Sequence, residues 1–154
     1  MCFSDPSQKV IPKTYIASEP AYRINRGRNE NDPSAYHLRT RASIQRHLDH
    51  SPAPTAESRK KGNKRYPKRY NDRENLFREP SLYEYPSKSW PYNQQNAKGK
   101  AYTAGANGQR VQVDPEFTRT VTDRNKNVKG VIYHPEGDRS GFVRAQEVNR
   151  GRRR

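Results

Sequence analysis

The sequence predicts an α+β fold with a small sheet-based core, little helix and long irregular loops. Residues 117–142 hold two β-branched runs on either side of a polar Asp/Asn/Lys turn, which is typical of a β-hairpin. Hydrophobic residues make up only 29% of the 154-residue chain, but ten tyrosines can each bury a large area. We therefore expect one domain over residues 31–149, a loosely ordered segment at 1–30 and a basic disordered tail at 150–154.

The helix is expected just after the polar N-terminal segment. Asp32 followed by Pro33 matches an N-cap and a first helical position, and apolar residues then recur at helical spacing as far as Leu48. Prolines at 52 and 54 close the pattern. The sequence thus predicts a helix from residue 32 to about His50.

The net charge of +15 is the strongest compositional signal. An excess of Lys and Arg this large indicates a polyanionic partner, most simply RNA or DNA. The basic runs at 59–69 and 150–154 are predicted to hold long RNA through its phosphates without reading its sequence. Solubility alone and attraction to an anionic membrane are the alternatives, although no amphipathic basic helix and no apolar run of membrane-spanning length are present.

Cys2 is the only cysteine, so the sequence predicts no intramolecular disulfide and no cysteine-based metal site. The first ten residues lack the apolar core of a signal peptide. We expect a protein that works inside a cell or a processed form of a longer chain, and its location stays open.

Three short motifs carry chemistry. Residues 66–77 read YPKRYNDRENLF, residues 82–86 read LYEYP, and residues 130–134 read GVIYH at the end of the predicted hairpin. In LYEYP, the alternation of Leu82 and Glu84 with the two tyrosines predicts a strand. In a hairpin the start of the first strand lies beside the end of the second, so Arg119 and His134 are expected at one end of a sheet.

Together these motifs resemble the fungal guanyl-specific ribonucleases, a family of the microbial ribonuclease fold. The chain keeps the family's Tyr-Glu-x-Pro strand, resembles its Gly-Val-Ile-x-His strand, and preserves the intervals between its catalytic Arg, His and Phe. The matching positions are Tyr66, Pro67, Tyr70, Asn71, Glu74, Tyr83, Glu84, Pro86, Arg119, His134 and Phe142. The resemblance covers residues 32–148 and implies one helix packed on a twisted antiparallel β-sheet, with long loops and flexible basic ends.

The resemblance implies a metal-independent endoribonuclease that cleaves single-stranded RNA by transesterification. Glu84 would be the base that takes the 2′-hydroxyl proton, and His134 the acid that protonates the departing 5′ oxygen. The product would be a 2′,3′-cyclic phosphate and then a 3′-phosphate. Arg119 and Lys68 would stabilise the added charge on phosphorus, so no metal or other cofactor is expected.

Two further residues complete the catalytic set that the resemblance implies. Tyr66 would donate a hydrogen bond to a phosphate oxygen, and Phe142 would pack beside the site and limit water. Lys68 stands where the family has a histidine; it keeps the positive charge but is a poor proton acceptor near neutral pH. Glu84 is therefore the one base that the motif offers.

The resemblance also implies a guanine-binding loop. The Glu74 carboxylate would accept two N–H bonds from the guanine edge, and the flat side chains of Tyr70 and Arg73 would stack on a base. The remaining members of the predicted base-binding set are Asn71, Asp72 and Ser140. Asp72 and Ser140 each replace a family Asn, and the change at 140 is expected to loosen the preference for guanosine.

Two other interpretations of the function stay open. One is a non-catalytic RNA-binding protein, because some fungal effectors resemble this fold but have lost the catalytic set; retention of Glu84, Arg119 and His134 favours the enzyme. The other is a largely disordered basic chaperone or ribosome-associated protein, in line with the low apolar content. A monomer with RNA as partner is expected, no membrane partner is expected, and a protein inhibitor remains open.

Overall fold

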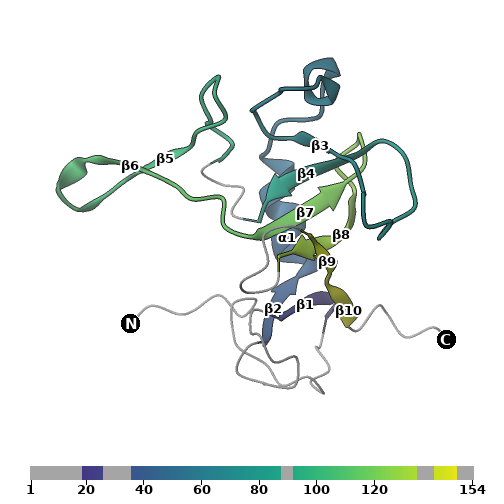
Figure 1. Ribbon diagram of the computed structural model, residues 1–154. Helices are drawn as coiled ribbons and strands as arrows, with labels where there is room; N and C mark the ends of the chain where they lie inside the picture. Colours follow the sequence, from purple (N-terminus) through teal and green to yellow (C-terminus); the bar gives the residue numbers. More distant parts are fainter. Residues whose placement is uncertain (1–18, 26–35, 88–91, 135–140, 149–154) are drawn as a thin grey trace.

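The structure is a computed structural model that describes residues 19–25, 36–87, 92–134 and 141–148. It has one α-helix and ten strands in these ranges, arranged in three antiparallel sheets (Figure 1). The elements are β1 (Ala21–Asn25), β2 (Tyr36–Thr40), α1 (Arg41–Asp49), η3 (Ala56–Arg59), β3 (Lys68–Tyr70), β4 (Leu82–Pro86), β5 (Tyr102–Ala104), η4 (Ala106–Gly108), β6 (Arg110–Gln112), β7 (Thr118–Thr122), β8 (Val128–Tyr133), β9 (Val143–Arg144) and β10 (Gln146–Val148). The predicted α+β class, one helix with antiparallel sheet, is confirmed.

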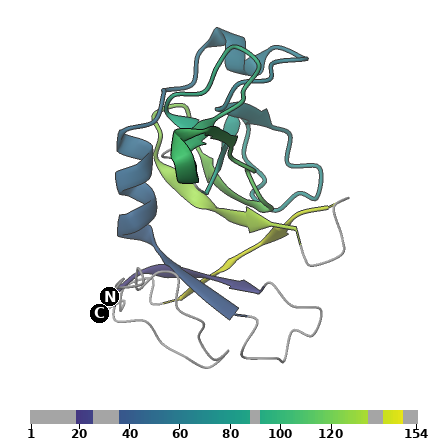
Figure 2. The same cartoon turned by 90° about the vertical axis from the view of Figure 1, so that its left-hand side faces the viewer.

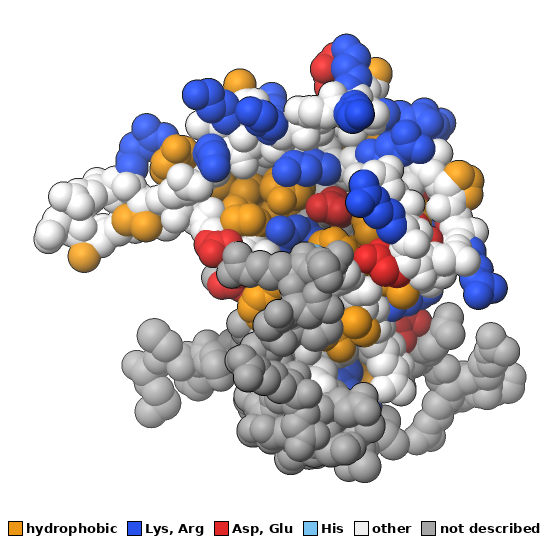
Figure 3. All heavy atoms as spheres, in the orientation of Figure 1, with side chains coloured by type: hydrophobic (Ala, Val, Ile, Leu, Met, Phe, Trp, Pro, Cys, Tyr) orange, Lys and Arg blue, Asp and Glu red, His pale blue; other side chains and the backbone are white. Residues whose placement is uncertain are grey.

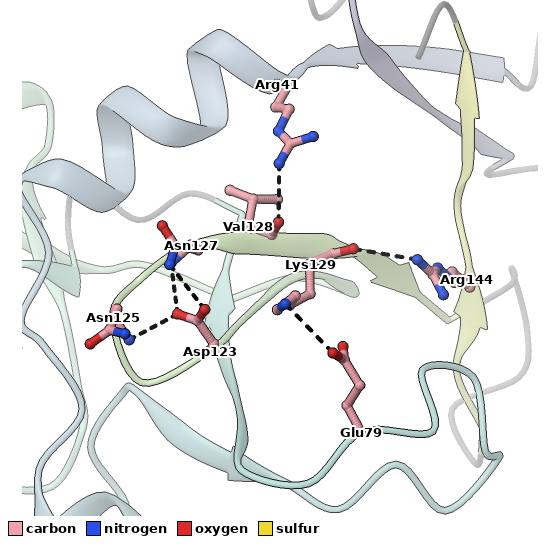
Figure 4. Close-up of polar contacts among 8 residues, drawn as sticks. All are labelled: Arg41, Glu79, Asp123, Asn125, Asn127, Val128, Lys129 and Arg144. Carbon is pink, nitrogen blue, oxygen red and sulfur yellow. Dashed lines mark hydrogen bonds and ion pairs between the residues drawn. The ribbon is translucent and has the colours of Figure 1, made fainter. Parts of the chain in front are cut away.

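The central sheet has five strands in the order β3-β4-β7-β8-β9. Its middle is the predicted hairpin, in which Arg119 of β7 lies opposite Ile132 of β8. Asp123 shapes the turn, because its carboxylate accepts hydrogen bonds from the backbone N–H of Asn125 at 2.8 Å and of Asn127 at 3.0 Å (Figure 4). The prediction of a hairpin with a polar turn in this stretch is therefore confirmed.

A second, three-stranded sheet has the order β10-β1-β2. Its middle strand β1 belongs to the 1–30 segment that the composition suggested would be loosely ordered, yet β1 is paired on both sides. The chain passes from the central sheet into this sheet through Ala145, whose N–H donates to the carbonyl of Val131 at 2.8 Å (Figure 2). The C-terminal stretch therefore joins the two sheets.

The predicted start of the helix at residue 32 is wrong. Residues 36–40 form strand β2, which pairs with β1 along its whole length, and the helix begins only at Arg41. Thr40 is the N-cap, and its hydroxyl accepts the Ser43 N–H at 3.2 Å. The prediction failed because the pairing of residues 36–40 with β1 is a tertiary interaction, which a local N-cap pattern cannot indicate. The helix end near His50 is confirmed, since His50 is the C-cap.

The central sheet is covered on both faces. On one face the helix residues Ile44 and Leu48 belong to a cluster that includes the buried Tyr85 and Val131. On the other face Leu82, Val121 and Ile132 pack with Tyr70 and with partly buried residues of the following loop. Tyrosines supply much of this core, which is how a chain with few aliphatic residues closes it.

Strands β5 and β6 form a separate hairpin that projects from the body of the molecule (Figure 1). All their residues are exposed, and Arg110 covers the Tyr102 ring with its guanidinium carbon 4.2 Å from the ring centroid. We call this hairpin the β5–β6 arm. Within the described ranges, no helix has the length and apolar character required to cross a membrane.

Val131→Ala tests the core. Val131 is fully buried between α1 and the central sheet, so the substitution should lower the free energy of unfolding by about 1–3 kcal/mol through lost burial and the cavity left behind. Urea denaturation measures this loss. Val111→Ala is the matched control: Val111 is 48% exposed in the arm and should change stability by less than about 0.5 kcal/mol. An equal loss in both variants would contradict this packing.

Candidate active site

The register of three strands brings together Lys68, Glu84 and Arg119. Lys68 lies directly opposite Glu84 across the β3–β4 pair, and Arg119 lies opposite Pro86 across the β4–β7 pair. Because alternate residues of a strand share a face, Glu84 has a cation from each neighbouring strand on its own side of the sheet. The distance from Arg119 Nε to Glu84 Oε1 is 3.8 Å. The predicted base and the two predicted charge-stabilising residues are therefore neighbours.

Tyr66 joins this group from the segment just before β3. Its ring is 7% exposed, and the Lys68 ammonium lies 4.5 Å from the ring centroid. The guanidinium carbon of Arg119 lies 5.8 Å from the same centroid. Tyr66 thus supports both cations with its ring, as cation–π geometry favours.

The protonation of Glu84 and Lys68 follows from their burial. Burial raises the pKa of the Glu84 carboxyl, and the charges of Arg119 and Lys68 oppose that shift without cancelling it. Burial lowers the pKa of Lys68, the Glu84 carboxylate counteracts this, and Arg119 adds to it. A carboxylate with a raised pKa is a better proton acceptor, so the environment suits Glu84 to general base chemistry.

Hydrogen bonds to backbone carbonyls hold the Arg119 side chain in place. Its Nη1 donates to the carbonyls of Pro115 at 3.0 Å, Glu116 at 2.7 Å and Thr118 at 3.1 Å. The side chain is only 10% exposed. These bonds orient the guanidinium toward Glu84 and at the same time anchor the segment that leads into β7.

His134 lies just past the end of β8, at the same end of the hairpin as Arg119, as predicted. Its backbone N–H donates to the Phe117 carbonyl at 3.0 Å. Its Nδ1 lies 2.6 Å from the Gly141 carbonyl oxygen. A carbonyl only accepts, so Nδ1 carries a proton and Nε2 is the nitrogen whose protonation can change.

Phe142 connects His134 to the predicted base-binding loop. Its ring stacks on the imidazole, with the centroids 3.9 Å apart and the planes inclined by 25°. Its backbone N–H donates to Glu74 Oε1 at 3.1 Å. A single residue therefore contacts both the predicted acid and the predicted guanine-binding carboxylate.

The loop between β3 and β4 is ordered by Asp72. The carboxylate accepts backbone N–H groups from Leu76 at 2.6 Å, Phe77 at 3.0 Å and Arg78 at 2.9 Å. Burial alone would raise the Asp72 pKa, but these hydrogen bonds outweigh it and lower the pKa. Asp72 was predicted to contact substrate; here its carboxylate shapes the loop that carries Asn71, Arg73 and Glu74.

The loop packs closely on the sheet. Arg144 donates from Nη1 to the Leu76 carbonyl at 3.0 Å and covers the Phe77 ring. Glu79 pairs with Lys129 of β8 at 3.5 Å (Figure 4). A Cβ on Gly130 would lie 2.7 Å from the Phe77 ring, which explains why the GVIYH motif begins with glycine.

The predicted base-stacking residues have different environments. Tyr70 is buried, and its ring packs edge-on against Phe77 and Phe142, with centroid distances of 6.0 and 6.3 Å. Asn71 and Arg73 are exposed. Of the two predicted stacking residues, Arg73 is thus the one that is open to solvent. Ser140, also predicted to bind the base, lies outside the described residues.

Gln95 positions the site but carried no signal in the sequence. Its amide oxygen accepts the Tyr66 N–H at 2.6 Å, and its amide nitrogen donates to the Tyr66 carbonyl. This pairing holds the 92–100 segment beside Tyr66. The segment has no recognisable motif and falls among the long irregular loops that the sequence predicts.

The described residues contain no group of three or more His, Cys, Asp or Glu side chains arranged to hold a metal. No family model, no curated protein and no solved structure matches this chain. The function must therefore be argued from the chemistry of the site itself.

Asp72→Asn tests how the loop is held. At pH 7 the variant should be less stable by about 1 kcal/mol, because charge-assisted bonds to three backbone N–H groups weaken, discounted for exposure. The lowered pKa of Asp72 means that its stabilisation is present above its unfolded pKa of about 3.9 and is lost as pH falls through the folded value. Urea denaturation at pH 7 and at pH 3 should show the gap between wild type and variant closing in acid.

Asp114→Asn is the control for this prediction. Asp114 accepts one backbone N–H, from Glu116 at 2.8 Å, in an exposed turn. Its substitution should change stability by less than about 0.5 kcal/mol. A gap for Asp72→Asn that does not depend on pH would mean that the charge of Asp72 is not what holds the loop.

Proposed function

We propose that the protein is a metal-independent endoribonuclease that cleaves single-stranded RNA, preferentially after guanosine. The observation that carries the proposal is a largely buried carboxylate, Glu84, flanked by Lys68 and Arg119, with His134 at the same end of the sheet. RNA brings its own nucleophile, the 2′-hydroxyl. A base, an acid and cations to stabilise charge on phosphorus are therefore sufficient for cleavage.

In the proposed first step, Glu84 removes the proton of the 2′-hydroxyl as its oxygen attacks phosphorus. His134 donates a proton from Nε2 to the departing 5′ oxygen, which leaves a 2′,3′-cyclic phosphate. In the second step the roles reverse: His134 accepts a proton from water, and Glu84 returns one to the 2′ oxygen. Arg119 and Lys68 stabilise the negative charge that develops on the phosphoryl oxygens in both steps.

The same site supports a preference for guanosine. The Glu74 carboxylate is exposed and is oriented by the Phe142 N–H. Guanine presents ring and exocyclic N–H donors side by side, which a carboxylate can accept together, while Arg73 is available to stack on the base. Because Phe142 also stacks on His134, base binding and the acid are linked through one residue.

A non-catalytic RNA-binding protein is the second candidate. It is favoured by two observations: Lys68 stands where the resemblance calls for histidine, and Arg119 uses Nη1 on three backbone carbonyls. Such a protein would bind RNA with the same cations and leave it intact. Incubation with labelled RNA separates the two candidates directly.

Glu84→Gln and His134→Gln should each reduce the cleavage rate by about 10²–10⁴-fold, the range for general acid–base groups. Cleavage of labelled RNA is the measurement, with circular dichroism to verify folding. Glu57→Gln and His50→Gln are matched controls on exposed residues outside the site and should retain wild-type rates. EDTA should have no effect on any of them. Full activity in a folded Glu84 or His134 variant would refute the assignment.

Sequencing of the cleavage ends tests base choice. Most cuts by the wild type should follow a guanosine, and Glu74→Gln should weaken that preference because one acceptor oxygen becomes a donor. Glu57→Gln, an exposed change in η3, should leave the preference intact. Ends without base bias in the wild type would show that the loop does not read guanine.

A further inference from the structure

A cavity of about 370 Å³ adjoins the candidate site on the side away from the base-binding loop. It is lined by lysines from three segments and by the foot of the β5–β6 arm. The principal residues are Lys64, Tyr66, Lys68, Lys98, Lys100 and Gln112. We call it the lysine pocket. Tyr66 and Lys68 belong to both the pocket and the candidate active site, so the two are continuous.

The turn that places Lys98 and Lys100 in the wall of the pocket is held by specific backbone contacts. Asn96 accepts the backbone N–H groups of both lysines through its side-chain oxygen, at 2.9 and 3.0 Å. Gly99 lies between them with φ +73°, and a Cβ there would lie 1.9 Å from the Lys64 carbonyl oxygen. Together with the pairing of Gln95 and Tyr66, these contacts hold the turn against the Lys64 segment.

Lys68 has Glu84 as its counter-charge, but within the described ranges Lys64, Lys98 and Lys100 have no acidic partner. No carboxylate there forms an ion pair with Lys64, Lys98 or Lys100, and no acidic residue is among those that line the cavity. Figure 3 shows Lys and Arg side chains gathered over the upper part of the molecule and beside the root of the arm. Several cations that line one cavity without acidic partners favour an anion as its ligand.

The aromatic residues of the pocket argue against a base as the ligand. The rings of Tyr66 and Tyr92 are 7% and 3% exposed and pack edge-on against each other, with centroids 5.4 Å apart. Neither ring offers a face on which a base could stack. The chemistry on offer is therefore that of a phosphate.

Strand β3 and the residues just before it run past the three regions in turn. Tyr70 adjoins the base-binding loop, Lys68 faces Glu84, and Tyr66 borders the lysine pocket. We infer that the lysine pocket binds the phosphate that follows the scissile one, on the 3′ side of the cleaved RNA strand. This direction rests on the proposed function, because a guanosine in the loop supplies the 5′ side of the cut.

The test compares the dinucleotide GpU with GpUp, which carries one additional 3′-phosphate. For the wild type, kcat/KM should be about threefold to tenfold higher on GpUp, in the range of one phosphate contact. The double variant Lys98→Ala/Lys100→Ala should bring the ratio of the two kcat/KM values close to one. Arg46→Ala/Arg124→Ala removes the same charge from exposed positions on α1 and the β7–β8 turn and should keep the wild-type ratio.

Affinity measurements distinguish failure of the pocket proposal from failure of the proposed ribonuclease activity. Analogues of both substrates with 2′-deoxyguanosine cannot be cleaved by the proposed mechanism, so their affinities report on the pocket alone. The wild type should prefer the analogue with the 3′-phosphate, and the Lys98/Lys100 variant should lose this preference. The slope of log K against log salt should also become shallower in the variant by about 0.7, the value for one phosphate contact on a single strand.

An absence of RNA cleavage with this binding preference intact would overturn the proposed ribonuclease and retain the pocket as a phosphate site. Equal affinity for both analogues, or an equal loss in the Arg46/Arg124 control, would overturn the pocket. A preference for a 5′-phosphate on GpU over a 3′-phosphate would overturn its placement on the 3′ side.

Discussion

The structure depends on the environment of one carboxylate, Glu84, on strand β4 of the five-stranded sheet. Removing a carboxylate from water is costly unless cations or hydrogen-bond donors compensate. Lys68 and Arg119 provide part of that compensation from the strands on either side. The pairing of β4 with β3 and β7 therefore supplies counter-charges to Glu84 as well as backbone hydrogen bonds. A shift of the register by one residue would turn the Glu84 side chain into the core on the helix side of the sheet.

Polar side chains hold much of what surrounds this sheet. Asp72 organises the loop after β3, Asp123 the hairpin turn, Gln95 the 92–100 segment and Asn96 the turn at the end of that segment. Each accepts backbone N–H groups that no strand or helix would satisfy. A chain with only 29% hydrophobic residues has little apolar surface with which to pack its loops, and hydrogen bonds of this kind take over part of that role. The loops are consequently placed accurately enough to line a site.

The parts of the fold that were predictable share a local cause. The β7–β8 hairpin and strand β4 follow from alternation and turn chemistry within a few residues. The start of the helix was not predictable in this way, because residues 36–40 become extended only through pairing with β1. In the candidate site, the position of Arg119 and His134 at one end of the sheet follows from the hairpin. The packing of Phe77 and Phe142 on Tyr70 requires contacts between separate segments.

The sequence by itself determined the fold class, the central hairpin, the strand that carries Glu84 and the excess of positive charge, because composition and short-range pattern encode each of these. Only the tertiary structure decided that Asp72 serves the loop, that Arg73 rather than Tyr70 is open to solvent, and that Lys64, Lys98 and Lys100 surround one cavity. Those arrangements arise where segments far apart in the chain meet, as Gln95 meets Tyr66. A local sequence pattern does not encode such a contact, because its stabilising free energy arises only when the two segments pack together.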